Sequence, residues 1–398
     1  MRRLLFTNGT VFDGTGAPPA PADVVVEGDR IVAVGIGLDG DDAVDCTGRT
    51  ILPGLIDSHV HLMIDGLDPL GWLHDPFSLQ FYRAATSMRK TLDVGITTVR
   101  DAGGADLGVR EAQRRGLVKG PRVQIAISML SQTGGHGDPW AASGCHVPIF
   151  VPHPGRPAGV VDGTDEARRK VRELVRAGAD VIKIATSGGV VSARDDPRHG
   201  HFRDAEVAVI VEEATSAGIP VMAHAAATDG IKTAVRAGVR SIEHGIFLDD
   251  EAVELMVENK AWLVPTLIAP HGVVRAAEAG AAISEHVLEK AHLVIRAHRE
   301  SVRRAIEAGV RIAFGTDTGV TPHGRNLDEL ALLVECGLTP AQALRAATRE
   351  AAQLLGTTDL GTVEPGKIAD LVLVDGDLSE VDTLAERVRA VYQGGVEV

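Results

Sequence analysis

The chain has 398 residues, of which 44% are hydrophobic, so it can bury one large core or two ordinary ones. Its 40 basic and 54 acidic residues give a net charge of -14, which argues against a nucleic-acid partner, and no uncharged apolar run approaches the roughly 18 residues that span a bilayer, which argues against a membrane role. The three cysteines, Cys46, Cys145 and Cys336, form no CxxC pair, so we expect reduced thiols in the cytoplasm rather than disulfides or a cysteine zinc site.

The N-terminal segment, residues 1–52, is predicted to contain short β-strands. Its apolar runs at 4–7, 23–27 and 30–34 are separated by turns rich in glycine and aspartate. Polar residues at 7–10 interrupt the first apolar run, so we expect no export signal.

Beyond this segment, a small residue followed by glycine repeatedly separates a helical pattern from an apolar run. These glycines are Gly95, Gly178, Gly218, Gly238 and Gly309. Glycine accepts the left-handed conformation that closes a helix, so each of them predicts a helix end followed directly by a strand. Residues 166–176 show the expected helical spacing of apolar side chains before Gly178.

Alternating helices and apolar strands predict parallel strands joined by helical crossovers. The strand candidates are 54–61, 96–101, 122–128, 181–185, 221–225, 241–244, 262–267 and 311–316. Eight such strands predict an α/β fold, a (β/α)8 TIM barrel over residues 53–356. A doubly wound open sheet is the alternative, but no GxGxxG turn follows the first strand.

The C-terminal stretch, residues 361–398, is again rich in predicted β-structure, with its clearest strand at 370–374. Each end of the chain alone is too short to bury a core. We therefore expect residues 1–52 and 357–398 to form one small β-sandwich domain beside the barrel.

The first barrel strand ends in the motif Asp57-Ser58-His59-Val60-His61. Side chains two apart on a strand point the same way, so both imidazoles are expected at the C-terminal mouth of the barrel, where barrel active sites lie. Alone, this motif is weak evidence for a metal. Three more candidate ligands at strand ends, namely His224, His244 and Asp317, favour a zinc-type hydrolytic site over buried, hydrogen-bonded histidines.

Lys183 lies inside an apolar strand, where a charged ammonium is costly. Burial lowers a lysine's pKa, and the free amine can take up carbon dioxide to give a carbamate with two oxygens that can bridge two metals. The alternatives are a lysine paired with a neighbouring acid and a lysine that extends out of the barrel.

The set His59, His61, Lys183, His224, His244 and Asp317, in this strand order, resembles the amidohydrolase superfamily in its two-metal form with a carboxylated lysine. Segments 8–14, 51–57 and 361–374 also look like the entry and closing segments of that family, so the resemblance covers nearly the whole chain.

The resemblance implies two divalent metal ions. His59, His61 and Asp317 would bind the more buried ion, His224 and His244 the more exposed one, and carboxylated Lys183 would bridge them. A metal-bridging hydroxide would attack the substrate, with Asp317 as the proton acceptor. Zinc is the default, while manganese, cobalt and iron suit the same ligands.

Within the superfamily, the closest resemblance is to imidazolonepropionase-like and prolidase-like dipeptidases. It is carried by the glycine-rich segments 131–138 and 187–192. In related enzymes the histidine matching His136 contacts the substrate beside the reacting carbonyl. Several members have a tyrosine where this chain has Ala226, so a free carboxylate in the substrate is in doubt. The candidate substrate contacts are His136, Gly188, Gly189, Arg194, Arg198, His323 and Arg325.

The favoured function is hydrolysis of an amide bond in a dipeptide, an N-acyl amino acid or an aryl amide. A carbamate, urea or cyclic-amide hydrolase would use the same metal centre. A mononuclear deaminase is disfavoured by Lys183, and a non-catalytic assembly protein is disfavoured because no ligand is missing. We expect a small-molecule substrate, no nucleic acid or membrane partner, and a homo-oligomer.

Overall fold

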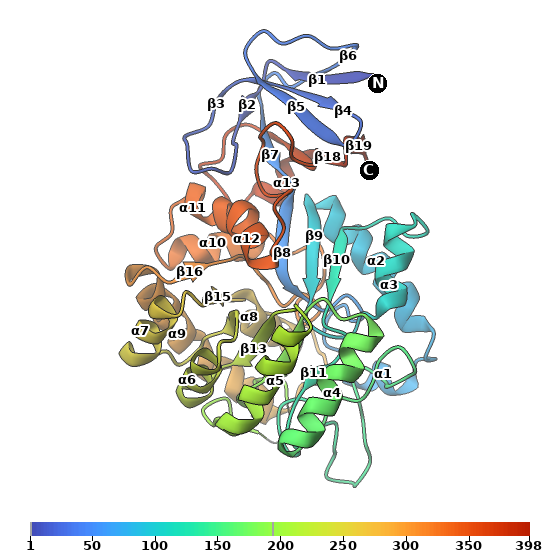
Figure 1. The fold of residues 1–398 in the computed structure, drawn as a ribbon, viewed down its shortest axis with the longest axis vertical. Helices are drawn as coiled ribbons and strands as arrows, with labels where there is room; N and C mark the ends of the chain where they lie inside the picture. Colours follow the sequence, from blue (N-terminus) through green and yellow to red (C-terminus); the bar gives the residue numbers. More distant parts are fainter. Residues whose placement is uncertain (1, 193–194) are drawn as a thin grey trace.

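The computed structural model describes residues 2–192 and 195–398. Its central part alternates helices with parallel strands, in a mixed α/β fold (Figure 1). The central strands are β8 (Leu55–Val60), β9 (Ile96–Asp101), β10 (Arg122–Ile125), β11 (Met129–Leu130), β12 (Ile182–Ala185), β13 (Val221–Ala225), β14 (Ser241–His244), β15 (Trp262–Val264) and β16 (Arg311–Ile312).

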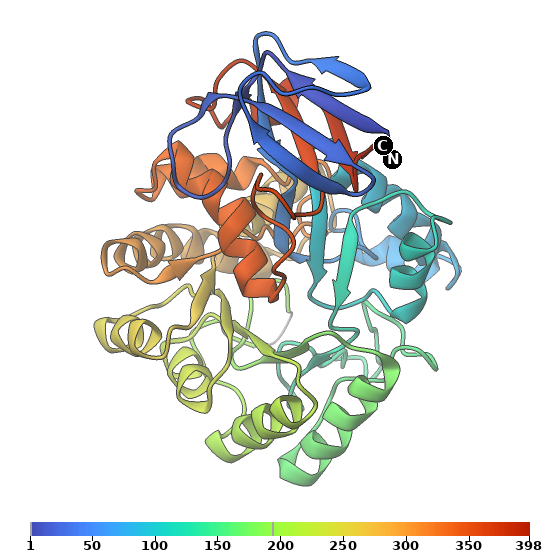
Figure 2. The ribbon, with the colours of Figure 1, turned by 45° about the horizontal axis from the view of Figure 1, so that its top comes forward.

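The central strands form two parallel sheets. One has the order β10-β9-β8, and the other runs from β11 to β16 in chain order. Backbone hydrogen bonds join the two sheets at both ends: Asp180 N donates to Ile125 O at 2.8 Å, and Ser58 N donates to Phe314 O at 2.9 Å. The strands are almost entirely buried, because helices lie around the outside of them (Figure 2).

The helices around these strands follow the predicted alternation. They are α1 (Pro69–His74), α2 (Leu79–Asp93), α3 (Leu107–Arg114), α4 (Gly163–Ala177), α5 (Asp204–Ser216), α6 (Thr228–Ala237), α7 (Asp250–Glu258), α8 (Ile268–Glu278), α9 (Glu285–Glu307), α10 (Asp328–Glu335), α11 (Pro340–Arg345), the π-helix η1 (Ala346–Glu350), α12 (Ala351–Leu355) and, near the C-terminus, α13 (Leu384–Arg387). Gly178 and Gly238 close α4 and α6 in the left-handed conformation, with φ of 95° and 92°, as their position predicts.

Two of the predicted strands differ from the expectation. The third, expected over 122–128, ends at Ile125 as β10, and Ile127, with a φ of 69°, separates it from the short strand β11. The last, expected over 311–316, is a regular strand only in β16; beyond it Phe314 N donates to Ala346 O, while Ala313 N still donates to Leu263 O.

The two ends of the chain come together in one six-stranded sheet, with the order β19-β18-β17-β7-β2-β3. β17 pairs antiparallel with β7, and Leu371 lies opposite Pro53. A four-stranded sheet, β5-β4-β1-β6, lies against it, and the two share an apolar cluster. The strands are β1 (Arg3–Thr7), β2 (Thr10–Val11), β3 (Ala20–Pro21), β4 (Asp23–Glu27), β5 (Arg30–Gly35), β6 (Asp42–Asp45), β7 (Arg49–Pro53), β17 (Leu371–Asp375), β18 (Val388–Gln393) and β19 (Val396–Glu397).

Gly54 joins the terminal sheet directly to the central strands, because it lies between β7 and β8. A Cβ at this position would lie 2.2 Å from Thr97 Oγ1, so only glycine lets the backbone approach β9 this closely. One nearly continuous run of chain therefore leads from the terminal sheet to His59. Among the described residues, no helix has both the length and the apolar character needed to cross a bilayer.

Candidate metal centre

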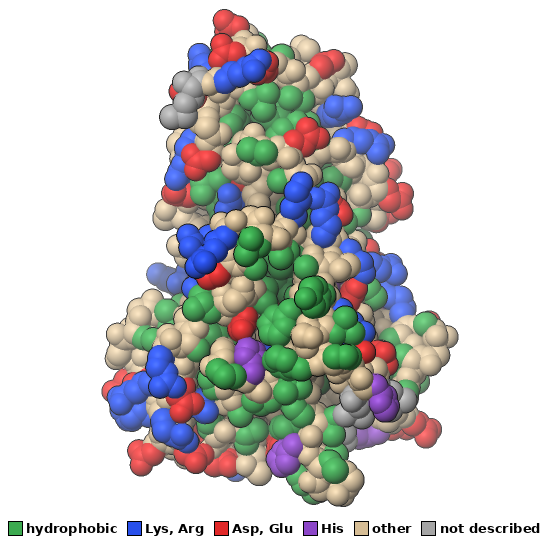
Figure 3. Space-filling model, turned by 90° about the vertical axis from the view of Figure 1, so that its right-hand side faces the viewer, with side chains coloured by type: hydrophobic (Ala, Val, Ile, Leu, Met, Phe, Trp, Pro, Cys, Tyr) green, Lys and Arg blue, Asp and Glu red, His purple; other side chains and the backbone are tan. Residues whose placement is uncertain are grey.

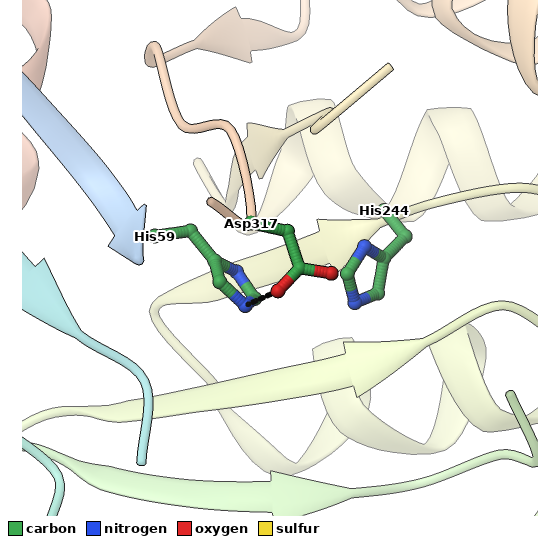
Figure 4. Close-up of side chains that lie close together, drawn as sticks. All are labelled: His59, His244 and Asp317. Atoms are coloured by element: carbon green, nitrogen blue, oxygen red, sulfur yellow. Dashed lines mark ion pairs between the residues drawn. The ribbon is translucent and has the colours of Figure 1, made fainter. Parts of the chain in front are cut away.

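The predicted ligands lie at the carboxyl ends of the central strands. β8 supplies His59 and leads to His61, β12 supplies Lys183, β13 supplies His224, β14 ends at His244, and Asp317 follows β16. His59, His244 and Asp317 point toward one another, with one potential ligand atom of each within 4.8 Å of the others (Figure 4). These three side chains form a group that could hold a metal ion.

The other predicted ligands join this group. His61 Nε2 lies 3.2 Å from Asp317 Oδ1, and Lys183 Nζ lies 3.5 Å from His59 Nε2. The ring centroids of His224 and His244 are 4.6 Å apart. All six side chains named from the sequence are therefore brought to one place.

Partners outside the group orient the imidazole rings. His61 Nδ1 lies 2.7 Å from Gly103 O, and His224 Nε2 lies 3.1 Å from Gly188 O. A carbonyl oxygen only accepts, so each contacting nitrogen carries a proton. His244 Nδ1 lies 2.7 Å from Thr266 Oγ1, a hydroxyl that can donate or accept.

A buried ion pair that the sequence analysis did not identify supports His59. Glu243 Oε2 lies 2.7 Å from His59 Nδ1, and Arg100 Nη2 lies 2.9 Å from Glu243 Oε1. Arg100 also donates from Nε to Ser58 O at 2.7 Å. A charged residue inside an apolar strand drew attention to Lys183, and the same signal exists at Arg100 in β9 and at Glu243 in β14.

Burial controls the protonation of the group. It lowers the pKa of Lys183 to about 8, although the negative charges of Glu243 and Asp317 oppose this shift. It also holds the pKa values of His59, His224 and His244 well below the usual value, so these rings are neutral near pH 7.

At His61 and Asp317, interactions with neighbouring residues outweigh burial and shift the pKa values against its effect. Burial alone would lower the pKa of His61, but the hydrogen bond from its ring to Asp317 raises it. The same bond and the charges of His59 and His61 lower the pKa of Asp317 against the effect of burial. The neutral rings of His59, His224 and His244 beside the ionised carboxylate of Asp317 are a donor set that suits a divalent cation.

The backbone is strained where these side chains leave it. Asp317, His244 and Thr266 adopt left-handed conformations, with φ of 58°, 73° and 56°. Such conformations are costly for residues other than glycine, and they persist where the surrounding structure over-determines them, commonly at functional sites.

Asp57 fixes the segment that precedes Asp317. Its buried carboxylate accepts hydrogen bonds from Thr316 Oγ1 at 2.6 Å and from Asn326 Nδ2 at 2.8 Å. Burial raises its pKa to about 7 despite these bonds. Asp57, the first residue of the Asp57-Ser58-His59-Val60-His61 motif, thus ties β8 to the segment that carries Asp317.

His136 lies beside the cluster. Its ring stacks on that of His224, with a centroid distance of 4.1 Å and an interplanar angle of 16°. A Cβ at Gly189 would lie 2.2 Å from the His136 ring, and one at Gly188 would lie 2.2 Å from Asp196 O, so both positions are too crowded for a side chain. The structure brings these three residues to the site, and their contact with substrate stays a prediction.

The other predicted substrate contacts lie elsewhere or are not described. His323 is 4% exposed, and its ring contacts Thr91 and the backbone of His61 and Ile64. The side chains of Arg325 and Arg198 are exposed and pair with Asp328 and Asp196. Arg194 lies outside the described residues.

Apolar side chains surround the cluster. Phe150 stacks on His61 with a centroid distance of 5.7 Å. Val320, whose N donates to Asp317 O at 3.1 Å, belongs to an apolar cluster with residues of α8 and α9, against which Val190 packs. Ala226 is fully buried. Apolar side chains thus lie next to His61 and beside the backbone of Asp317.

The chain is similar to known proteins over nearly its whole length. Residues 50–398 match the Amidohydrolase family. An ochratoxinase of Aspergillus niger is 34% identical over 97% of this chain and 85% of its own, and an imidazolonepropionase of Micrococcus luteus is 28% identical over 94% and 93%. The crystal structure of a Xaa-Pro dipeptidase with bound methionine in the active site matches with a TM-score of 0.91 and 35% identity, over 100% of this chain and 99% of the other.

Proposed function

Because this chain belongs to the amidohydrolase family, we propose that it hydrolyses the amide bond of a small molecule at a pair of divalent cations. It is a hydrolase that acts on carbon–nitrogen bonds. The observation that carries the proposal is the convergence of four imidazoles, a carboxylate and a buried lysine at the carboxyl ends of the central strands.

The donor set fits two cations. His59, His61 and Asp317 would hold one, and His224 and His244 would hold the other. Lys183 would bridge them after its free amine adds to carbon dioxide, which gives a carbamate and releases one proton. The lowered pKa of Lys183 supports this step, because more of the amine is free at neutral pH than in an exposed lysine. When bound, such cations lower the pKa of water and polarise a carbonyl group, and zinc is the first candidate.

The chain's own groups would move the proton and hold the substrate. Asp317 has a lowered pKa and is therefore ionised, so it can accept a proton from the attacking water and pass it to the leaving amine. His136 would contact the substrate beside the scissile carbonyl, which its stacking on His224 supports.

The substrate class that we propose is an amide with a large apolar group: an aryl amide, an N-acyl amino acid or an apolar dipeptide. Phe150 beside His61 and the cluster around Val320 support this, because they offer apolar contact next to the ligands. Ala226 is fully buried, so it offers the substrate no hydroxyl group where related enzymes have a tyrosine. The ochratoxinase and the Xaa-Pro dipeptidase fit the same class of bond.

At the level of the fold, we infer that the central strands close into a (β/α)8 barrel over residues 53–356. The hydrogen bonds from Asp180 to Ile125 and from Ser58 to Phe314 support closure. We also infer that residues 1–52 and 357–398 form a β-sandwich domain, which the shared apolar cluster supports.

We further propose a cytoplasmic homo-oligomer that acts on a small molecule. The cysteines are all free, which suits a reducing compartment.

Hydrophobic side chains gather on the side of the molecule drawn in Figure 3, and large exposed apolar patches commonly mark interfaces. Large apolar side chains that are partly exposed include Phe77, Tyr82, Ile149 and Val151.

Metal analysis combined with a substrate screen tests the proposal. We expect about two equivalents of metal per chain, and turnover of aryl amides and N-acyl amino acids that a chelator removes and added metal with bicarbonate restores. Lys183→Met should lose most bound metal and turnover. One equivalent of metal per chain, together with deaminase activity, would indicate a mononuclear deaminase. Preferential turnover of carbamates or ureas would mean that one of these compounds, and not an amide, is the substrate. A stable protein without bound metal or turnover would contradict the proposal.

A further inference from the structure

The ammonium of Lys290, on α9, is enclosed by the segment that follows β12. The residue is 5% exposed. Its Nζ donates to Ser192 O at 2.6 Å and to Gly189 O at 2.7 Å, and it reaches Asp195 O at 3.1 Å. The carboxylate of Asp195 lies 3.4 Å away and supplies the compensating charge.

This arrangement gives the buried ammonium a partner for each of its protons. An ammonium has three protons to donate, and here three carbonyls and one carboxylate surround it. A buried ammonium without such partners is costly, so the contacts of Lys290 favour the observed placement of Gly189, Ser192 and Asp195. Among the described residues of α9, Lys290 is the one whose side chain bonds to this segment.

The same segment holds two histidines of the candidate site. Ser192 Oγ lies 2.9 Å from His136 Nδ1 and also contacts the Asp195 carboxylate. The other oxygen of that carboxylate lies 3.6 Å from His136 Nδ1 and accepts from Gly189 N at 3.1 Å. Gly188 O, in turn, contacts the ring of His224.

We propose that Lys290 is a positioning residue: by binding Gly189, Ser192 and Asp195 it holds the His136 ring flat against His224 and directed at the substrate. The effect on turnover rests on the proposed function. The placement of the segment by Lys290 does not, because it follows from contacts within the chain.

The kinetic test replaces the ammonium with an apolar side chain of similar length, Lys290→Met. We expect kcat/KM to fall about 10- to 100-fold, the range typical of residues that orient a ligand, with metal content unchanged. Lys232→Met is the matched control, because Lys232 also binds two carboxylates, at 2.7 and 2.6 Å, but on the outer surface at α6. It should keep wild-type turnover.

A double-mutant cycle separates positioning from general destabilisation. If Lys290 acts through His136, then Lys290→Met should change kcat/KM less than about 2-fold in a His136→Gln background. Added n-propylammonium supplies the side-chain atoms that are missing in Lys290→Ala, so it should restore part of the turnover that this variant loses. If the effects of Lys290→Met and His136→Gln on kcat/KM multiply in the double variant, the proposal is overturned. A wild-type kcat/KM in Lys290→Met would also overturn it.

Hydrogen–deuterium exchange of the metal-free protein gives a readout that does not need turnover. In Lys290→Met, amides of residues 186–192 should exchange faster, while those of β14 and α6 should not change. Unchanged exchange in that segment would refute the placement even if the enzyme hydrolyses amides. Failure of wild-type turnover alone would contradict only the proposed function.

Discussion

At the scale of single residues, Asp317 has the most distinctive environment. It is held in a left-handed conformation, with its carboxylate within 3.2 Å of His61 and 3.5 Å of His59. The ring hydrogen bond and charges keep its pKa low, so it is an ionised acceptor throughout the neutral range. Both its position and its charge suit a proton acceptor.

Asp317→Asn removes the acceptor but keeps the size of the side chain. We expect kcat to fall by at least about 100-fold, because a general base contributes 10²- to 10⁴-fold, while metal remains bound. Steady-state kinetics and metal analysis on the same preparation measure both. Asp328→Asn, at an exposed ion pair with Arg325, is the control and should behave as wild type. Wild-type kcat in Asp317→Asn would remove Asp317 from the mechanism.

The ligand set could be predicted because it has a local signal: histidine, lysine or aspartate at the end of an apolar strand. Arg100 and Glu243 carry a similar signal but act on each other across the strands, and only the fold shows that they meet at His59. Lys290 has no local signal, because a lysine on an amphipathic helix is usually exposed. His323 had the right residue type, but its ring supports the backbone of His61 and Ile64 instead of facing the cluster.

At the scale of elements, glycine positions and apolar runs predicted the alternation of helices and strands well. They could not predict where the third and last strands become irregular, because Ile127 and Phe314 follow contacts with distant segments. The joining of the two ends was predicted only because each end is too short to bury a core by itself. The pairing partner of each strand was not, since register depends on which apolar faces meet.

The packing between the terminal sheets can be tested at Phe6, which is fully buried in β1, with its ring 4.8 Å from that of Tyr392 in β18. Phe6→Ala should lower the free energy of unfolding by about 3–5 kcal/mol, because it leaves a cavity between the two sheets. Denaturant-induced unfolding measures this loss. Ile36→Ala, at a side chain 85% exposed, should change stability by less than about 0.5 kcal/mol. Equal stability of the two variants would contradict the shared core.

At the scale of the whole molecule, the reactivity of the three cysteines reports on whether a reagent can reach the interior of the folded protein. Burial raises the pKa values of Cys46 and Cys336 to about 11, so at pH 8 both remain neutral thiols, whereas Cys145 is exposed. Only a thiolate attacks a disulfide reagent.

We therefore expect such a reagent to label one thiol per native chain quickly at pH 8, and all three in denaturant. Cys145→Ser should abolish the fast phase. Rapid labelling of a second thiol in the native protein would show that Cys46 or Cys336 is accessible.

The pairing of β7 with β17 has a consequence for how the protein is made. A ribosome releases Pro53 long before Leu371, its partner in the sheet. Until the last strands emerge, β7 has an unpaired edge beside the histidines of β8, and contacts this distant in sequence form slowly. Growing chains should therefore depend on chaperones for most of their synthesis, and shortening the C-terminus should yield aggregates rather than a smaller active enzyme.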